Sequence, residues 1–239
     1  MTKAGKVFAV AVFAALAWAV APDAEAQPPI RIGASLSLTG TYAAIGQNQH
    51  RGYQLCVKHT NEKGGVLGRK LELVLHDDAS DPTTAVRLYE HVITQDKVDL
   101  VLGPYSSPIN DAVANVTEKH KMPMMAHAAT TSIFKKGRKF VFMVIPRAEV
   151  FFEGLIDLAA KKGLKTVAII NEDTVFPKAV AQGAMELAKK KGLQPVFTEA
   201  YPQGNTDFSA ILRRLVALNP DVLAAATYFA KTPPPSPGR

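Results

Sequence analysis

Short apolar runs of strand character alternate with amphipathic helical stretches, and this alternation limits the fold more than any other feature of the chain. In the first half, strands are predicted at residues 30–38, 70–76, 99–102, 123–126 and 140–145. Between them, helices are predicted at residues 46–61, from residue 82 with Asp81 as its N-cap, and from residue 107. Because each strand is followed by a helix and another strand, the pattern predicts a parallel, doubly wound α/β sheet.

The same alternation restarts after Pro146 and Arg147. Helices are predicted at residues 150–162, 177–191 and 207–218, and strands at residues 166–170, 194–199 and 221–228. We therefore expect two Rossmann-like lobes, at residues 27–146 and 147–230, arranged as a clam-shell.

The stretch from residue 99 to 131 contains the best candidate site in the first lobe. Its two predicted strands, residues 99–102 and 123–126, both end in loops that carry hydroxyl groups. Ser107 is predicted to be the N-cap of the intervening helix, with Pro108 at the first helical position. Ligands of open α/β sheets bind at the carboxyl edge, where a helix N-terminus favours an anion such as a carboxylate. The alternative is that Ser107 only caps the helix.

Residues 1–26 have the pattern of a secretory signal peptide. Lys3 and Lys6 precede an apolar run at residues 7–21, which is short for a membrane span, and residues 24–26 (AEA) fit the cleavage rule. We expect the mature protein to begin at Gln27 and to be periplasmic; an uncleaved membrane anchor is the alternative.

Composition excludes some classes of function. The chain has 239 residues, 47% of them hydrophobic, and a net charge of +7. Its basic residues are not interleaved with aromatic ones, so a nucleic-acid groove is not expected. Cys56 is the only cysteine, which leaves no internal disulfide, and we expect it to be a small buried hydrophobe.

The sequence contains few of the motifs that would indicate an enzyme. Residues 76–78 (HDD) and Asp81 could suggest a metal cluster, but neighbouring strand residues point to opposite faces, so we expect no metal site there. The chain lacks a Gly-x-Ser-x-Gly elbow and a Gly-x-Gly-x-x-Gly fingerprint. We therefore expect neither a hydrolase nor a dinucleotide enzyme, and no cofactor.

Several motifs together resemble the periplasmic leucine/isoleucine/valine-binding proteins, the solute receptors of branched-chain amino-acid ABC importers. They are GPYSSP, PMMAHAATT, GASLSLTGTYAAIGQ, NEKGGVLGRKLELVLHDDASDPTTAV and TDFSAILRRL. The resemblance covers residues 30–230. It implies the type I two-lobed fold with an incomplete second lobe in residues 147–230, a non-enzymatic binding function and an ABC permease as partner.

The resemblance also implies a set of ligand-binding residues. Ser107 would bind the α-carboxylate of an amino acid, and Thr130 its amino or carboxylate group. The Ala128 carbonyl would accept a hydrogen bond from the ammonium, and Tyr228 would close over the ligand. Three further residues complete the expected site: Tyr42, Ser106 and Phe176.

The sequence departs from the family pattern at several positions. Ile45 precedes Gly46 where the family often has an aromatic residue, and Phe176 stands where a tyrosine is common. Ser80 and Ser106 stand where some members have a disulfide. The acid that pairs with the ligand ammonium in the family falls beyond the matching region.

The expected function is that of a monomeric extracytoplasmic receptor that binds a branched-chain or related aliphatic or aromatic amino acid. An exported sensor of an amide or small organic acid is one alternative, and a non-functional truncated fragment is another. A Rossmann-like enzyme is the third. The Pro-rich end, residues 231–239 (KTPPPSPGR), is typical of an extended linker. We interpret it as a frameshift or a truncated reading frame, with a genuine short variant as the alternative.

Overall fold

A computed structural model describes residues 27–228 of the chain. The predicted signal sequence (residues 1–26) and Pro-rich end (residues 231–239) lie outside these residues. The described part contains no helix that is long and apolar enough to cross a membrane.

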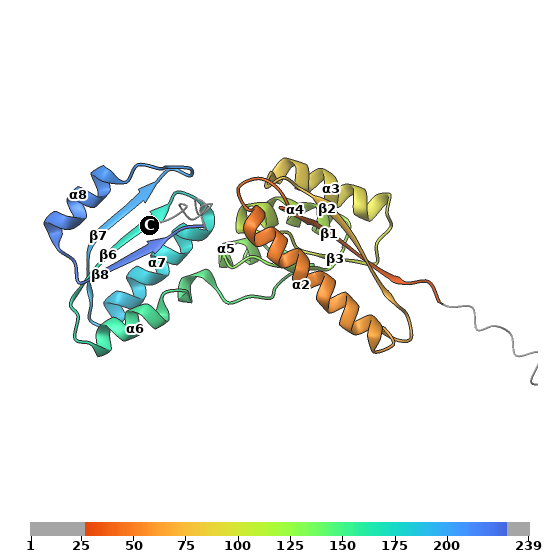
Figure 1. Cartoon of the computed structure of the whole chain (residues 1–239), viewed down its shortest axis with the longest axis horizontal. Coiled ribbons are helices and arrows are strands. Elements are labelled where there is room, and N and C mark those ends of the chain that lie inside the picture. The colour runs from red at the N-terminus through yellow and green to blue at the C-terminus, as the bar shows by residue number, and fades with distance from the viewer. Residues whose placement is uncertain (1–26, 229–239) are drawn as a thin grey trace, which may run out of the picture.

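The strands form two separate parallel sheets (Figure 1). The five-stranded sheet has the order β2-β1-β3-β4-β5, and the three-stranded sheet has the order β7-β6-β8. Their bounds are β1 Ile30–Leu36, β2 Leu71–Asp77, β3 Leu100–Leu102, β4 Met124–Ala126, β5 Val141–Met143, β6 Thr166–Glu172, β7 Gln194–Tyr201 and β8 Val222–Ala226. All neighbouring strands are parallel. The predicted parallel α/β architecture with two lobes is confirmed.

Helices connect the strands as the crossover rule requires. Their bounds are α2 Ala43–Glu62, α3 Pro82–Thr94, α4 Ser107–Lys119, α5 Thr131–Phe134, α6 Glu153–Lys161, α7 Val175–Lys190 and α8 Ser209–Leu218. A 3₁₀ turn, η1 (Ala148–Val150), precedes α6 where the sequence predicted one continuous helix. The short helix α5 was not predicted.

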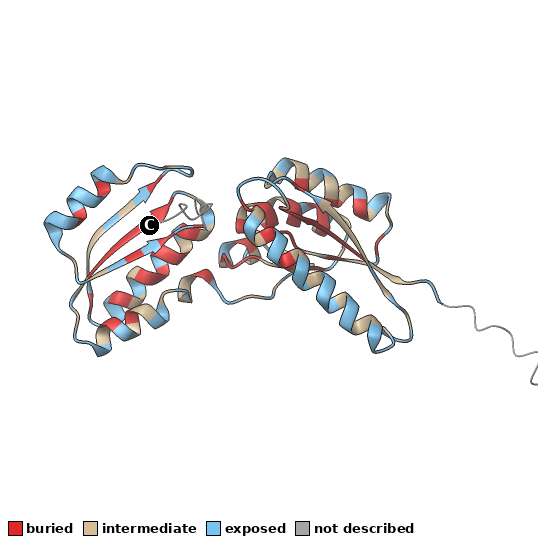
Figure 2. Ribbon diagram, viewed as in Figure 1, coloured by how far each residue is buried: buried red, intermediate tan, exposed pale blue. Residues whose placement is uncertain are grey.

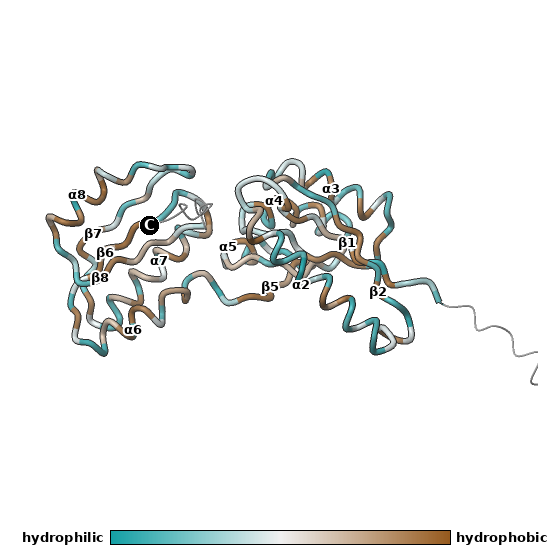
Figure 3. Tube along the Cα trace, viewed as in Figure 1, coloured by the Kyte–Doolittle hydropathy of each residue, from teal (hydrophilic) through white to brown (hydrophobic). Residues whose placement is uncertain are grey.

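Each lobe has a core that follows the strand period. Figure 2 shows the buried residues concentrated in the strands and on the inner faces of the helices, and Figure 3 shows the same segments as the hydrophobic ones. Along β6, Val167 and Ile169 pack with α6 and α7, whereas Ala168 and Ile170 pack with Tyr201 and α8. Because successive side chains of a strand point to opposite faces, one strand serves both layers of the second lobe.

The N-terminus of α4 differs from the sequence prediction. Ser106 is the N-cap, with φ of 76°, and Ser107 is the first helical residue. The prediction that Ser107 is the cap was wrong, because the left-handed conformation of Ser106 turns the chain into the helix one residue earlier. No side chain forms a capping hydrogen bond here, so the cap-only interpretation of Ser107 fails as well.

Cys56 is exposed, so the prediction that it is buried was also wrong. The inward stripe of α2 runs through Gln49, Tyr53 and Val57, and Cys56 lies beside that stripe on the solvent side. Gln49 and Tyr53 hold α2 against the sheet by donating hydrogen bonds to the Gly103 carbonyl, at 3.1 and 3.0 Å.

The acidic residues at the end of β2 and just after it each have their own hydrogen-bond partners. Asp77 accepts hydrogen bonds from the Leu38 amide and the Thr39 hydroxyl. Asp78 is fully buried and accepts from two serine hydroxyls, and Asp81 caps α3 by accepting from the Thr84 amide at 2.6 Å. The predicted capping role of Asp81 is therefore confirmed.

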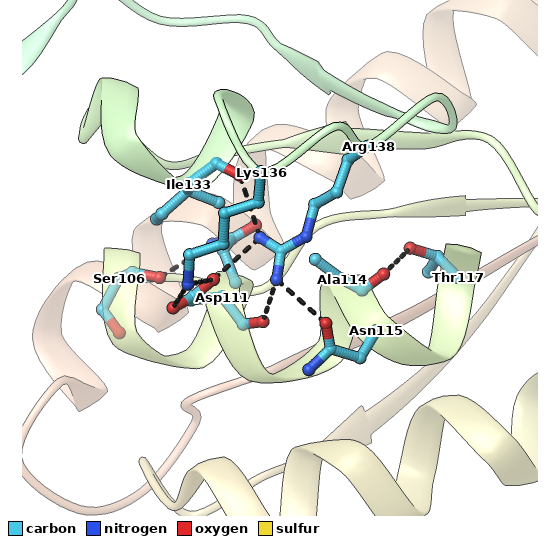
Figure 4. Close-up of polar contacts among 9 residues, drawn as sticks. Ser106, Asp111, Ala114, Asn115, Thr117, Ile133, Lys136 and Arg138 are labelled. Atoms are coloured by element: carbon cyan, nitrogen blue, oxygen red, sulfur yellow. Dashed lines mark hydrogen bonds and ion pairs between the residues drawn. The ribbon is translucent and has the colours of Figure 1, made fainter. Parts of the chain in front are cut away.

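A cluster centred on Arg138 fixes the segment between α5 and β5 against α4 (Figure 4). The Arg138 side chain is only 6% exposed, and its guanidinium contacts the Asp111 carboxylate at 2.7 Å, the Asn115 amide oxygen and the Ile133 carbonyl. Burial raises the pKa of Asp111, but hydrogen bonds from Lys136 and Arg138 outweigh it and hold that pKa below its usual 3.8.

We expect Arg138→Met to reduce the free energy of unfolding by about 2 kcal/mol, because the partly buried Asp111 carboxylate keeps Lys136 but loses its buried cationic partner. Since the folded-state pKa of Asp111 is lowered, its contribution is present above pH 3.8 and is lost as the pH falls through the folded-state pKa. Urea unfolding of the unsubstituted protein and of Arg138→Met over a series of pH values measures the difference between their free energies of unfolding. This difference should decrease as the pH is lowered. A difference that stays constant with pH would contradict the role given to Asp111.

Candidate ligand-binding site

A cavity of about 250 Å³ lies between the two lobes. Its walls come from the carboxyl edge of the first sheet, from the crossing segment and from the second lobe. The lining residues are Ile45, Tyr105, Ser106, Ser107, His127, Ala129, Ile145, Phe151, Phe176 and Tyr228. Pockets of drug-sized ligands usually measure about 300–1,000 Å³, so this cavity suits a smaller solute.

Four of the seven predicted site residues line this cavity: Ser106, Ser107, Phe176 and Tyr228. Thr130 lies behind the wall, where its hydroxyl donates to the Ser107 hydroxyl at 3.0 Å. Tyr42 packs against Tyr228, with ring centroids 5.0 Å apart. Ala128 is buried between two lining residues but does not line the cavity itself.

The loops after β3 and β4 are joined by Asn110, which the sequence did not single out. Its fully buried amide donates to the carbonyls of Pro104, Ser106 and His127, at 2.7, 2.8 and 3.3 Å. These bonds tie both strand ends to the first turn of α4. Asn110 therefore positions the loops that carry the lining serines and His127.

The polar groups on the cavity wall are neutral and partly unpartnered. Among the described residues, the buried Ser106 and Tyr228 hydroxyl groups form no hydrogen bond of standard geometry, although the Ser106 hydroxyl lies near Tyr42 and the Tyr228 hydroxyl near the Ser107 amide. The Ser107 hydroxyl accepts from Thr130 and donates to no protein group in residues 27–228. Buried polar groups are almost always hydrogen-bonded to protein, water or ligand, so these hydroxyls are available to bind a polar ligand or water at the α4 N-terminus.

The titratable groups of the wall stay uncharged near neutral pH. Burial lowers the pKa of His127 and raises the pKa of Tyr105 to about 12, with a further contribution from Tyr42. Burial and the nearby Tyr42 raise the pKa of Tyr228 as well. The wall that the described residues form has no carboxylate, ammonium or guanidinium group.

Aromatic rings form the apolar part of the wall and connect the lobes. The centroid of the Tyr228 ring lies 5.3 Å from that of Phe176 and 6.2 Å from that of Tyr105. The ring centroids of Phe151 and Phe176 are also 5.3 Å apart. Gln203 of the second lobe donates to the Tyr42 hydroxyl at 3.1 Å. Such a cavity can hold an aliphatic or aromatic group beside a small anion.

Sequence reasoning missed several lining residues. Tyr105 and His127 stand inside the two motifs that were singled out, directly after strands, so their position at the sheet edge was a usable signal. Phe151 and Ile145 come from the crossing between the lobes, where no local pattern marks them.

Two parallel α/β lobes with a small cavity between them, at the carboxyl edge of the first sheet, are the architecture of the type I periplasmic binding proteins. A family profile described as periplasmic binding protein matches residues 29–234. The chain belongs to this family of solute-binding proteins.

Individual relatives agree with this assignment. The Leu/Ile/Val-binding protein BraC3 of Rhizobium johnstonii is 32% identical over 216 residues, which cover 88% of this chain and 57% of that protein. A solute binding protein of an ABC transporter from Rhodopseudomonas palustris, in complex with 3,4-dihydroxybenzoic acid, is 26% identical with a TM-score of 0.74, over 83% of this chain and 54% of that one. The isoleucine complex of LivJ from Streptococcus pneumoniae is 25% identical with a TM-score of 0.74, over 82% of this chain and 56% of LivJ. The chain thus spans about half the length of the relatives it matches.

Proposed function

We propose that this chain is an extracytoplasmic receptor that binds a small carboxylate-bearing solute between its lobes and delivers it to an ABC permease. The observation that carries the proposal is the group of buried hydroxyls, including Ser106, Ser107 and Tyr228, around the first turn of α4. Hydroxyl and amide donors at a helix N-terminus bind a carboxylate without a buried cation. Its ligands are branched-chain or related aliphatic and aromatic amino acids.

Several features support an amino acid as the ligand. The relatives include a Leu/Ile/Val-binding protein and an isoleucine complex. Beside the hydroxyl groups, the side chains of Ile45, Ile145 and Phe151 offer an apolar surface that suits a branched or aromatic side chain. A two-lobed receptor of this kind works by hinge closure around the solute. It acts as a monomer in the periplasm.

A second candidate function is the binding of an aromatic acid that lacks an amine. The cavity wall in residues 27–228 carries no carboxylate to pair with an ammonium group, and an unpaired buried charge is costly. The Rhodopseudomonas palustris relative holds 3,4-dihydroxybenzoic acid, which has no amine.

Matched ligand pairs separate the two candidates. We expect leucine or phenylalanine to raise the melting temperature of the full chain, because a ligand that binds only the native state stabilises it. The control ligands are 4-methylpentanoate and 3-phenylpropionate, which keep each side chain and carboxylate but lack the amine. Benzoate and 3,4-dihydroxybenzoate complete the panel.

The shifts in melting temperature across this panel distinguish three interpretations of the chain. A larger shift with the amino acid than with its amine-free partner supports the amino-acid receptor. The reverse order supports the aromatic or aliphatic acid. No shift with any member of the panel would contradict both, and would favour the interpretation of the chain as a fragment that does not bind.

A further inference from the structure

A second cluster of potential ligands lies in the first lobe, away from the cavity. It consists of His76 near the end of β2, His91 in the last turn of α3, and Asp96 just after α3. Each offers one ligand atom, and all three atoms lie within 4.8 Å of one another. None of these residues lines the cavity between the lobes.

The distances match a divalent metal site. His76 Nε2 and His91 Nε2 lie 3.3 and 3.7 Å from the same oxygen, Asp96 Oδ2. Zinc bonds of about 2.0–2.1 Å at tetrahedral angles place ligand atoms about 3.4 Å apart. Both distances to Asp96 therefore lie near the spacing that one metal ion requires, and the two Nε2 atoms lie within 4.8 Å of each other.

A metal site explains the positions of His76, His91 and Asp96 better than an ion pair alone does. One protonated histidine would satisfy Asp96, whereas here two imidazoles converge on one carboxylate oxygen with ring centroids 5.7 Å apart. In the tautomer that leaves Nε2 without a proton, the two imidazoles and the carboxylate form a ligand set for a cation.

The cluster lies at the surface of the first lobe. The His91 side chain is 51% exposed and the His76 side chain 34% exposed, so solvent reaches the cluster. The basic side chain of Arg31 donates to the Asp96 backbone carbonyl rather than to its carboxylate, and its Nε lies 3.3 Å from Glu72. Its charge is therefore partly balanced by a different acid.

We propose that His76, His91 and Asp96 bind a divalent transition-metal ion, with Zn²⁺ as the best match, and that the ion fastens the C-terminus of α3 to the edge strand β2. Two imidazoles and one carboxylate favour zinc, nickel or copper over calcium or magnesium. The fourth position is open to water, as in zinc sites with three protein ligands.

The test is calorimetric titration of ZnCl₂ into the full chain without a histidine tag. We expect one ion per chain, and a rise in melting temperature with zinc because the ion binds the native state. His91→Ala and Asp96→Asn should each weaken binding at least tenfold. The matched control is His120→Ala, since His120 Nε2 contacts a different acid, Glu90, at 2.7 Å and should leave zinc binding unchanged.

Two further measurements keep the result interpretable. Melts in EDTA establish that each variant is folded, and His91 is exposed enough that its loss should not unfold the lobe. Co²⁺ should give the visible absorption of a four-coordinate site in the unsubstituted chain and lose it in His91→Ala. Absence of zinc binding, or binding that survives both His91→Ala and Asp96→Asn, would overturn the proposal.

Discussion

Gly46→Ala is expected to destabilise the first lobe by about 3 kcal/mol, at the upper end of the cost of overpacking. A Cβ atom at Gly46 would lie 2.0 Å from the Ser37 carbonyl oxygen and 2.7 Å from its carbonyl carbon. Both neighbours are backbone atoms just after β1, so no side-chain rotation can relieve the clash. Either α2 must move away from the sheet or the chain after β1 must distort.

A matched control lies in the same helix. A Cβ atom at Gly52 would meet nothing within 4 Å, so Gly52→Ala should gain about 0.5–1 kcal/mol from the higher helix propensity of alanine. Urea unfolding of the two variants gives the comparison directly. If both alanines changed stability by the same amount, the close approach of α2 to Ser37 would not be a constraint on the fold.

The close approach also has a consequence for the cavity. Ile45, the residue before Gly46, lines the cavity, and it reaches this position because α2 starts directly against the end of β1. Glycine at position 46 thus sets the position of an apolar wall residue. In Gly46→Ala, any protein that remains folded should bind the ligand of the proposed receptor more weakly.

The fold was predictable because its signals are local. Apolar runs of strand length marked each β-strand, and Asp81 followed by Pro82 marked the start of α3 with a capping mechanism that the structure confirms. Strand and helix ends shifted by a few residues, but the alternation alone required parallel sheets.

The wrong predictions concern features that tertiary packing determines and the local sequence does not. The left-handed conformation of Ser106 is not favoured by serine itself and depends on how the loop meets α4. The exposure of Cys56 depends on how α2 is rotated against the sheet. His76, His91 and Asp96 meet only because β2 and α3 pack together, so their spacing along the chain gave no indication of a cluster.

The position of the site was predictable for a topological reason. Parallel strands end at one edge, so the motifs after β3 and β4 had to come together there. Asn110 was not predictable, because an asparagine in a helix has many roles and only the folded loops reveal its three carbonyl partners.

The Ser107–Thr130 pair gives the sharpest test of the proposed ligand site. The two hydroxyl groups are both 2% exposed and are bonded to each other, Thr130 donating to Ser107 at 3.0 Å. Because Ser107 accepts this bond, its own proton is available to a ligand in the cavity. If Ser107 donates to a ligand carboxylate, each residue contributes to one charge-assisted bond.

We expect Ser107→Ala and Thr130→Ala each to weaken binding of the best ligand from the panel by about 10- to 100-fold, as hydrogen bonds to charged groups are worth about 1.5–3 kcal/mol. Because the two residues act through one bond, the double variant should lose less than the sum of the single losses. Ser132→Ala, on an exposed serine of α5 outside the cavity wall, serves as the control.

Stability measurements separate binding from folding in this series. Ser107 makes no capping hydrogen bond, so its replacement should change the free energy of unfolding by less than the roughly 1 kcal/mol of a lost cap. A large loss of affinity with a small change in stability is the signature of a ligand contact. Unchanged affinity in both single variants would remove Ser107 and Thr130 from the binding site, and the α4 N-terminus would no longer be the carboxylate position.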